Sequence, residues 1–150
     1  MLVYHVSHMN TTRLYRWITY IAVFGVGLAL YLLWQQVSKP AFQPCSINAT
    51  VNCDAIISGP VSMTLGIPTP LYGLAGYIFI LIASYMKWRK VVWGVATFGV
   101  LFCLRLFIIE IFQLHVICPV CIACQITMIS VWALATKLFR VPPLAPDRVM

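Results

Sequence analysis

Four long apolar runs dominate the chain and are separated by more polar segments. They cover approximately residues 14–34, 71–86, 91–112 and 119–139, and each is close to the roughly 20 residues that a helix needs to cross the core of a bilayer. Because a helix satisfies its own backbone polar groups in lipid, we expect each run to be a transmembrane helix. The pattern predicts an all-α integral membrane protein, a four-transmembrane-helix bundle that forms a single domain over residues 1–150.

One connector, about residues 35–70, is much longer than the others. It contains two cysteines and several prolines, among them Pro40, Pro44, Pro60 and Pro68, and unstructured loops of this length are usually functional. Asp54 is suited to cap a short helix that would stop at Gly59-Pro60. The apolar side chains around it predict a short surface helix that lies on the membrane and covers the mouth of the bundle. Residues 1–13 and 141–150 are expected to be loose tails.

The composition places the chain in a membrane, and the charges orient it there. Hydrophobic residues make up 62% of the sequence and charged residues 9%, with a mean hydropathy of +0.94, which is outside the range of soluble domains. The first apolar run lacks a cleavage pattern and is expected to be a retained helix. Eight of the ten basic residues fall on one side of the predicted bundle: Arg13, Arg16, Lys87, Arg89, Lys90, Lys137, Arg140 and Arg148.

This asymmetry predicts cytoplasmic chain termini in a multi-pass protein of the cell membrane, with the long loop on the extracytoplasmic side. The net charge of +7 then follows from topology and from contact with anionic lipid headgroups. A nucleic-acid-binding function is not needed to explain the charge.

Two cysteine pairs are expected to face the extracytoplasmic side. Cys45 and Cys53 lie in the long loop, and Cys118 and Cys121 lie at the start of the last helix. Backbone N–H groups at a helix start stabilise a thiolate, and Pro119 suits the first helical position. A static crosslink of Cys118 to Cys121 would close too short a loop to stabilise the protein much, so the pattern indicates redox chemistry. The loop pair alone is compatible with a structural disulfide or with thiol exchange.

A third hypothesis is a metal site, because Cys118, Cys121 and Cys124 form a Cys-x-x-Cys-x-x-Cys run. Such a site would need a fourth ligand from the loop cysteines or His115, so we favour the redox interpretation. Cys103 and Cys124 are expected to be inert packing residues.

We expect mainly structural roles for the other polar residues within or near the apolar runs. His115 is expected to be a surface residue, with action as a general base as the alternative. Arg105, inside the third run, is expected to have a structural or lipid-headgroup role, with tuning of a site as the alternative. Glu110 is expected to be a solvated or structural carboxylate, with proton transfer as the alternative.

The chain resembles the vitamin K epoxide reductase family, especially its prokaryotic branch, over about residues 14–139. The motifs that carry the resemblance occur in the following order: Cys45-x7-Cys53-Asp54, Ser58, Gly66-Ile67-Pro68-x-Pro70-Leu71-Tyr72-Gly73, Glu110 and Ile117-Cys118-Pro119-Val120-Cys121.

The resemblance implies a four-helix bundle that encloses a quinone, such as ubiquinone or menaquinone, next to the Cys-x-x-Cys motif, without a metal. It implies that an exported thioredoxin-like (DsbA-like) partner exchanges with Cys45. Cys53 would then attack the disulfide of the helix pair at Cys118, which leaves Cys121 to reduce the quinone. Two resting disulfide patterns are compatible with this scheme. In one, Cys45 pairs with Cys53 and Cys118 pairs with Cys121; in the other, Cys53 is captured in a disulfide with Cys118.

For the quinone pocket, Ser58 resembles a family serine that supports the active site. Thr69 and Gln125 stand where vertebrate members place an asparagine and a tyrosine, and either side chain can hydrogen-bond a carbonyl. Tyr72 is a candidate to contact the quinone ring. These differences favour a prokaryotic quinone reductase over an epoxide reductase of the eukaryotic type. A fused thioredoxin-like domain is not expected, so a separate partner would deliver the electrons.

Overall fold

The structure is a computed structural model that describes residues 2–38, 48, 50–53, 58–59 and 62–140. Its long helices are α1 (Leu2–Ser38), α3 (Thr69–Tyr85), α4 (Arg89–Ile109) and α5 (Pro119–Arg140). The predicted helical class is confirmed. The expectation of a loose tail before residue 14 is wrong, because α1 already begins at Leu2. Residues 2–13 contain neither proline nor glycine, so nothing in the sequence interrupts the helix there.

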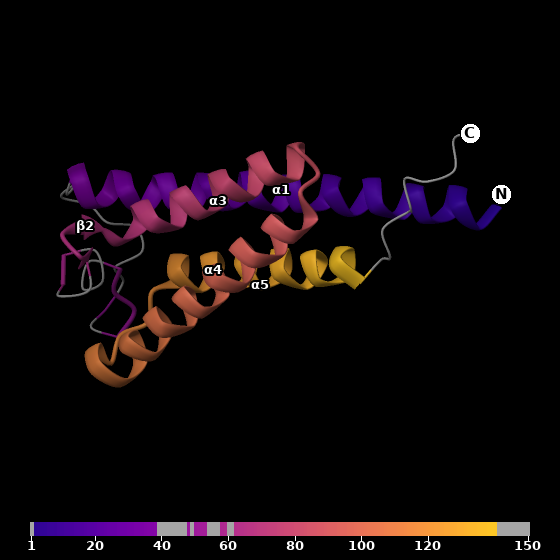
Figure 1. The fold of residues 1–150 in the computed structure, drawn as a ribbon. Helices are drawn as coiled ribbons and strands as arrows, with labels where there is room; N and C mark the ends of the chain where they lie inside the picture. Colours follow the sequence, from indigo (N-terminus) through magenta and orange to yellow (C-terminus); the bar gives the residue numbers. More distant parts are fainter. Residues whose placement is uncertain (1, 39–47, 49, 54–57, 60–61, 141–150) are drawn as a thin grey trace.

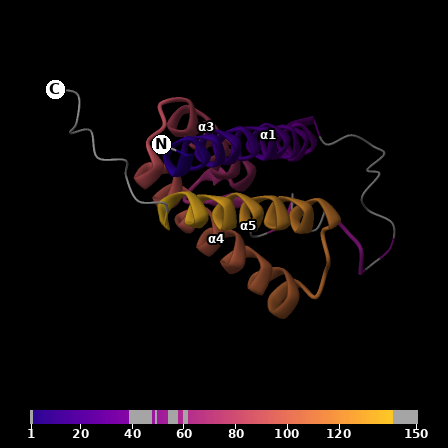
Figure 2. The same ribbon diagram turned by 90° about the vertical axis from the view of Figure 1, so that its right-hand side faces the viewer.

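The four helices run alternately up and down along the bundle (Figure 1). Helix α1 packs against α3 and α5, and α4 packs against α5 and α3. A turn of the π type, η1 (Glu110–Leu114), extends α4 before the chain reaches α5. The end of α1, the start of α3, η1 and the start of α5 therefore lie together, at what we call the loop end of the bundle. In Figure 2, α5 lies below α1, and α4 diverges from α5 toward its own C-terminal end.

Three of these helical segments are long and apolar enough to cross a membrane: Thr11–Ser38, Arg89–Leu114 and Pro119–Arg140. Large apolar side chains such as Phe24, Phe98 and Trp17 are more than half exposed on their outer surfaces, as contact with lipid allows. Helix α3 is also apolar but has 17 residues, which gives a length of about 25 Å at 1.5 Å per residue. A fourth span at α3 stays a prediction.

A close contact between α1 and α3 fixes one side chain that matters below. Tyr77 of α3 is 2% exposed, and its ring lies directly against Gly25 of α1, where any Cβ atom would overlap it. Small residues allow membrane helices to approach in this way. The Tyr77 hydroxyl then donates a hydrogen bond of 3.0 Å to the backbone oxygen of Cys124 on α5, so this residue joins three helices.

The described part of the long loop includes a hairpin of two short strands, in which β1 (Met63–Thr64) pairs antiparallel to β2 (Ile67–Pro68). Its turn residues Leu65 and Gly66 have φ angles of 55° and 80°, as a type I′ turn requires. Glycine adopts this conformation without the steric cost that a side chain brings. The short surface helix expected after Asp54 lies outside the described residues.

The hairpin is attached to the loop end of α1 and α3. The Gln36 side chain donates from Nε2 to the backbone oxygen of Ser62 at 3.0 Å, and the backbone N–H of Thr69 donates to the same oxygen at 2.9 Å. The Tyr72 hydroxyl donates to the backbone oxygen of Thr64 at 3.0 Å. These bonds hold the hairpin over the bundle interior.

Candidate active site

Cys118 occupies the position just before α5, where the helix presents unpaired N–H groups. The backbone N–H of Cys121 lies 3.3 Å from the Cys118 sulfur and points at it. A hydrogen bond from the Cys121 thiol lowers the pKa of Cys118; burial opposes this effect, and the N–H groups of Cys121 and Val120 lower the pKa further. A lowered pKa favours the thiolate form of Cys118 and makes this sulfur a better leaving group in disulfide exchange.

The sulfur of Cys118 also contacts the sulfur of Cys53, from the long loop, at a distance of 3.4 Å. Both residues are 0% exposed, and Leu32 of α1 packs against them. A disulfide bond is about 2.05 Å long, so the two atoms are little more than an ångström from bonding distance. The contact is shielded from water and from foreign thiols.

A short backbone bridge explains this contact. Val51 pairs with Ile117 as an isolated parallel bridge, in which the N–H of Ile117 donates to Thr50 at 2.7 Å and the N–H of Asn52 donates to Ile117 at 3.2 Å. Cys53 follows the bridge by two residues on one strand, and Cys118 follows it by one on the other. The pairing therefore brings the two cysteines together across 65 positions of sequence.

The cysteines differ in their redox state. Cys53 is disulfide-bonded, whereas Cys103, Cys118, Cys121 and Cys124 carry free thiols. Cys45 lies outside the described residues. The molecule thus holds an oxidised loop cysteine in contact with a reduced Cys-x-x-Cys motif.

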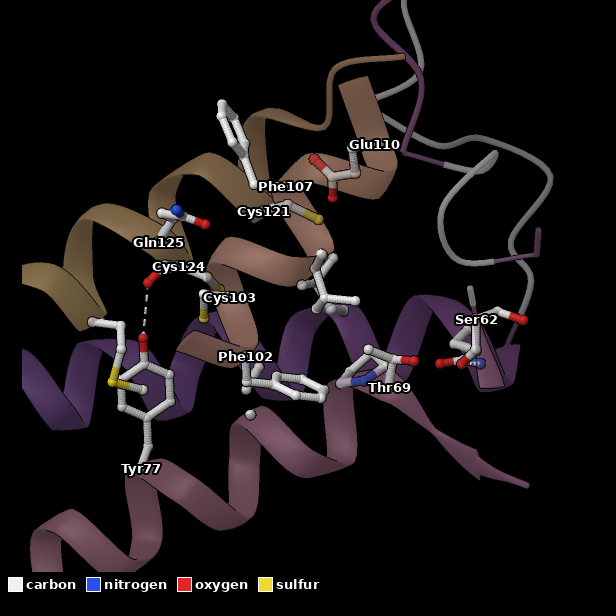
Figure 3. A pocket seen from close by; sticks show the side chains of 17 residues that line it. Ser62, Thr69, Tyr77, Phe102, Cys103, Phe107, Glu110, Cys121, Cys124 and Gln125 are labelled. Carbon is white, nitrogen blue, oxygen red and sulfur yellow. Dashed lines mark hydrogen bonds between the residues drawn. The ribbon is translucent and has the colours of Figure 1, made fainter. Parts of the chain in front are cut away.

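A cavity of about 100 Å³ lies beside Cys121, inside the bundle. This volume is well above the roughly 10–15 Å³ that one water molecule needs. In Figure 3, Cys121 and Glu110 lie at one side of the cavity, Cys124 and Tyr77 lie deeper along it, and Thr69 and Ser62 lie toward the hairpin. The walls are mainly apolar, with a few polar groups, as in sites for small apolar ligands.

Of the pocket residues proposed from sequence, the structure brings two to the cavity. Thr69, at the start of α3, and Gln125, on α5, both line it. Tyr72 instead packs against Phe102 in a tilted arrangement, with ring centroids 5.7 Å apart, and its hydroxyl is hydrogen-bonded to the hairpin. It therefore packs behind the cavity wall. Ser58 is exposed and is not among the described residues that line the cavity. Their roles in binding stay predictions.

Glu110 was expected to be a solvated or structural carboxylate, and the structure excludes the solvated alternative. It is 4% exposed, at the first position of η1, and its side chain lines the cavity beside Cys121 (Figure 3). The sequence contained a signal for this position, since Glu110 is one of only three acidic residues and lies within an apolar run, where ionisable groups are usually functional. Arg105 and His115 are exposed.

A second buried polar group, Gln36, was not identified from sequence. It is 8% exposed and lines the cavity. Because its Nε2 donates to a carbonyl, which can only accept, the amide orientation is fixed and Oε1 faces elsewhere. Among the described residues, Oε1 has no hydrogen-bond partner. A buried acceptor of this kind favours a ligand that carries a hydroxyl group.

The donor set suits a quinone, which combines a flat apolar ring with two oxygens that hydrogen-bond. Thr69 and Gln125 would donate to those oxygens within the apolar walls, and Gln36 Oε1 would accept a hydrogen bond from a hydroxyl of the reduced form. In the part of the chain that the structure describes, no three His, Cys, Asp or Glu side chains are grouped as a metal site requires. Cys103 and Cys124, expected only to pack, line the cavity as well.

Comparison with known proteins identifies the family of the chain. A model of the vitamin K epoxide reductase family matches residues 16–136. No curated protein matches the chain. The match covers α3 and α4 and most of α1 and α5, and it includes Cys53 and Cys118, whose sulfurs are in contact at the loop end. The chain therefore belongs to the vitamin K epoxide reductase family, a family of membrane oxidoreductases.

Proposed function

We propose that this protein oxidises the dithiol of an exported thioredoxin-like protein and passes the electrons to a membrane quinone, and so supports disulfide bond formation. Cys45 and Cys53 are the outer pair of the relay, and Cys118 and Cys121 are the inner pair. The observation that carries the proposal is the 3.4 Å contact between the sulfurs of Cys53 and Cys118. It joins a loop cysteine to the motif beside the cavity.

The first exchange takes place at the outer pair. A thiolate of the partner attacks the Cys45–Cys53 disulfide at Cys45, and the second partner thiolate then releases Cys45. The partner leaves with a disulfide, and the outer pair becomes a dithiol. In this proposal Cys45 is the disulfide partner of Cys53, which is disulfide-bonded in the structure.

The second exchange uses the buried contact. The Cys53 thiolate attacks Cys118 of the inner disulfide and expels the Cys121 thiolate. Cys45 then attacks Cys53, which restores the outer disulfide and expels the Cys118 thiolate. The lowered pKa of Cys118 favours this last departure. An oxidised Cys53 beside reduced Cys118 and Cys121, as in the structure, is the state after this transfer.

The inner dithiol then closes again to a disulfide. A quinone in the cavity would supply the acceptor for its two electrons, with two protons. Cys121 is the inner cysteine that lines the cavity, whereas Cys118 is fully buried against Cys53. Cys118 therefore exchanges with Cys53, and Cys121 reacts with the quinone. We place the loop end on the extracytoplasmic side of the membrane, because of the charge asymmetry.

A trapping experiment tests the proposed entry point. The Cys53→Ser replacement leaves Cys45 without its intramolecular partner. Cys45 should then form a lasting mixed disulfide with a thioredoxin-like protein whose second active-site cysteine is replaced by serine and whose remaining cysteine carries glutathione, because glutathione leaves and no partner thiolate remains to release Cys45. We expect the adduct to be visible on a non-reducing gel, with the crosslinked peptides identified by mass spectrometry. The Cys45→Ser variant is the control and should give no adduct. An adduct of equal yield at Cys118 would contradict the assigned order of the relay.

A further inference from the structure

A buried carboxyl group stands next to the inner dithiol. Glu110 is the first residue of the π-type turn η1; it is 4% exposed and lines the cavity. A charged group in apolar surroundings is costly unless it is hydrogen-bonded or functional. The described residues that line the cavity include no lysine, arginine or histidine to neutralise it. The thiol of Cys121 lies beside it at the same side of the cavity (Figure 3).

The backbone holds this carboxyl in place. Helix α4 ends at Ile109, and η1 begins at Glu110 itself. The backbone oxygen of Glu110 accepts hydrogen bonds from the N–H groups of His115 and Val116, and His115 leaves the turn with a left-handed φ of 53°. Single π turns are rare and frequently occur at functional sites. This turn points the Glu110 side chain toward α5 and Cys121 (Figure 3).

The titratable groups near Glu110 come from both sides of the cavity. Cys103 lies on α4, and Cys118 and Cys121 lie at the start of α5. Each is close enough to Glu110 for an electrostatic interaction with its carboxylate. Of these, Cys121 lines the cavity beside the Glu110 carboxyl (Figure 3). Glu110 therefore lies next to both the sulfur that reacts with the ligand in the proposed function and the space that the ligand would occupy.

We propose that Glu110 transfers the proton of the Cys121 thiol to the oxygen atom of the quinone in the cavity. The inference rests on the proposed function. In the net reaction the Cys118 and Cys121 thiols form one S–S bond and release two electrons and two protons, which convert a quinone to a quinol. Glu110 accepts the proton that Cys121 releases and donates it onward, so the carboxyl returns to its starting state. No other oxidant or reductant is needed.

The test separates proton transfer from a structural role. Glu110→Gln preserves the size and hydrogen bonding of the side chain but cannot carry a proton, and Glu110→Asp retains the carboxyl. For each purified full-length variant, the anaerobic dithiol form is mixed with a soluble short-chain quinone, and quinone absorbance is followed over a single turnover. Thiol exchange with a reduced thioredoxin-like protein is measured separately by alkylation and mass spectrometry. Gln113→Ala, at an exposed position of the same turn, is the matched control.

We expect Glu110→Gln to slow quinone reduction by about 10²- to 10⁴-fold, the usual contribution of a general acid–base residue, with thiol exchange within about twofold of wild type. Glu110→Asp should recover much of the rate. The infrared S–H band of Cys121 should shift in Glu110→Gln, because the acceptor changes from carboxylate to amide. Quinone reduction by Glu110→Gln at the wild-type rate, or an equal loss in both reactions, would overturn the inference. A wild-type dithiol form that reduces no quinone would instead remove the proposed function and this inference with it.

Discussion

Replacement of either inner cysteine, Cys118→Ala or Cys121→Ala, is expected to abolish quinone-dependent oxidation of a thioredoxin-like partner. The rate should fall by on the order of 10³ or more, because a covalent exchange step cannot proceed without its sulfur. Both variants should stop at the outer pair, because the Cys118–Cys121 disulfide that Cys53 attacks cannot form without either sulfur. Without Cys118, Cys53 also loses the sulfur that lies 3.4 Å away. Without Cys121, the inner pair loses its sulfur at the cavity.

Steady-state oxidation of the partner dithiol with added quinone measures this loss. Ser130→Ala is the matched control on α5, since the Ser130 hydroxyl bonds only to its own helix at Ile126, and it should retain activity. Alkylation of the stalled enzyme should find different free thiols in the two variants. Full activity in either cysteine variant would show that the inner pair is not part of the relay.

The second large effect concerns the buried sulfur contact. In the double variant Cys45→Ser with Cys121→Ser, both competing partners are removed, and Cys53 and Cys118 remain in contact at 3.4 Å. Mild oxidation should then join them by a disulfide between the loop and α5, because the sulfurs need to move by little more than an ångström. Non-reducing electrophoresis and peptide mapping would detect this crosslink.

The triple variant that also carries Cys118→Ser is the control. It leaves Cys53 with Cys103 and Cys124, which lie along the cavity. We expect at least about tenfold less crosslinking at Cys53 than in the double variant, because the contacting sulfur is gone. Equal yields in the two variants would mean that the 3.4 Å contact does not form in the protein in solution.

The sequence was sufficient to predict the helices and the start of α5. Apolar runs of suitable length report directly on membrane helices, and Pro119 after Cys118 marked the first turn of α5. The extension of α1 to Leu2 was missed because a polar composition had been interpreted as disorder. Helix propensity is independent of hydropathy, so an apolar run sets only a minimum length for a helix.

The contact of Cys53 with Cys118 could not be derived from local patterns. It depends on the bridge between Val51 and Ile117, an isolated backbone pairing without regular strands around it. Only the family resemblance suggested that the two cysteines react with each other. A long loop has too many conformations for its sequence to specify one such pairing.

The cavity was predicted only in part, for a geometric reason. Thr69 and Gln125 face it, whereas Tyr72, three residues beyond Thr69 on α3, turns toward Phe102 and the hairpin. Helical periodicity alone does not show which face of α3 meets the cavity, because all faces of a membrane helix are apolar. Glu110, near a helix end, was expected to be a solvated or structural carboxylate, and the π turn directs its side chain inward.

The central claim is that the inner dithiol reduces a quinone directly. The most direct measurement mixes the reduced protein anaerobically with one equivalent of a short-chain quinone and follows quinone absorbance and the thiol state of Cys118 and Cys121 together, by rapid alkylation and mass spectrometry. We predict that one quinol forms for each Cys118–Cys121 disulfide, at the same rate. Disulfide formation without loss of quinone, or quinol formation while both thiols remain free, would contradict the account.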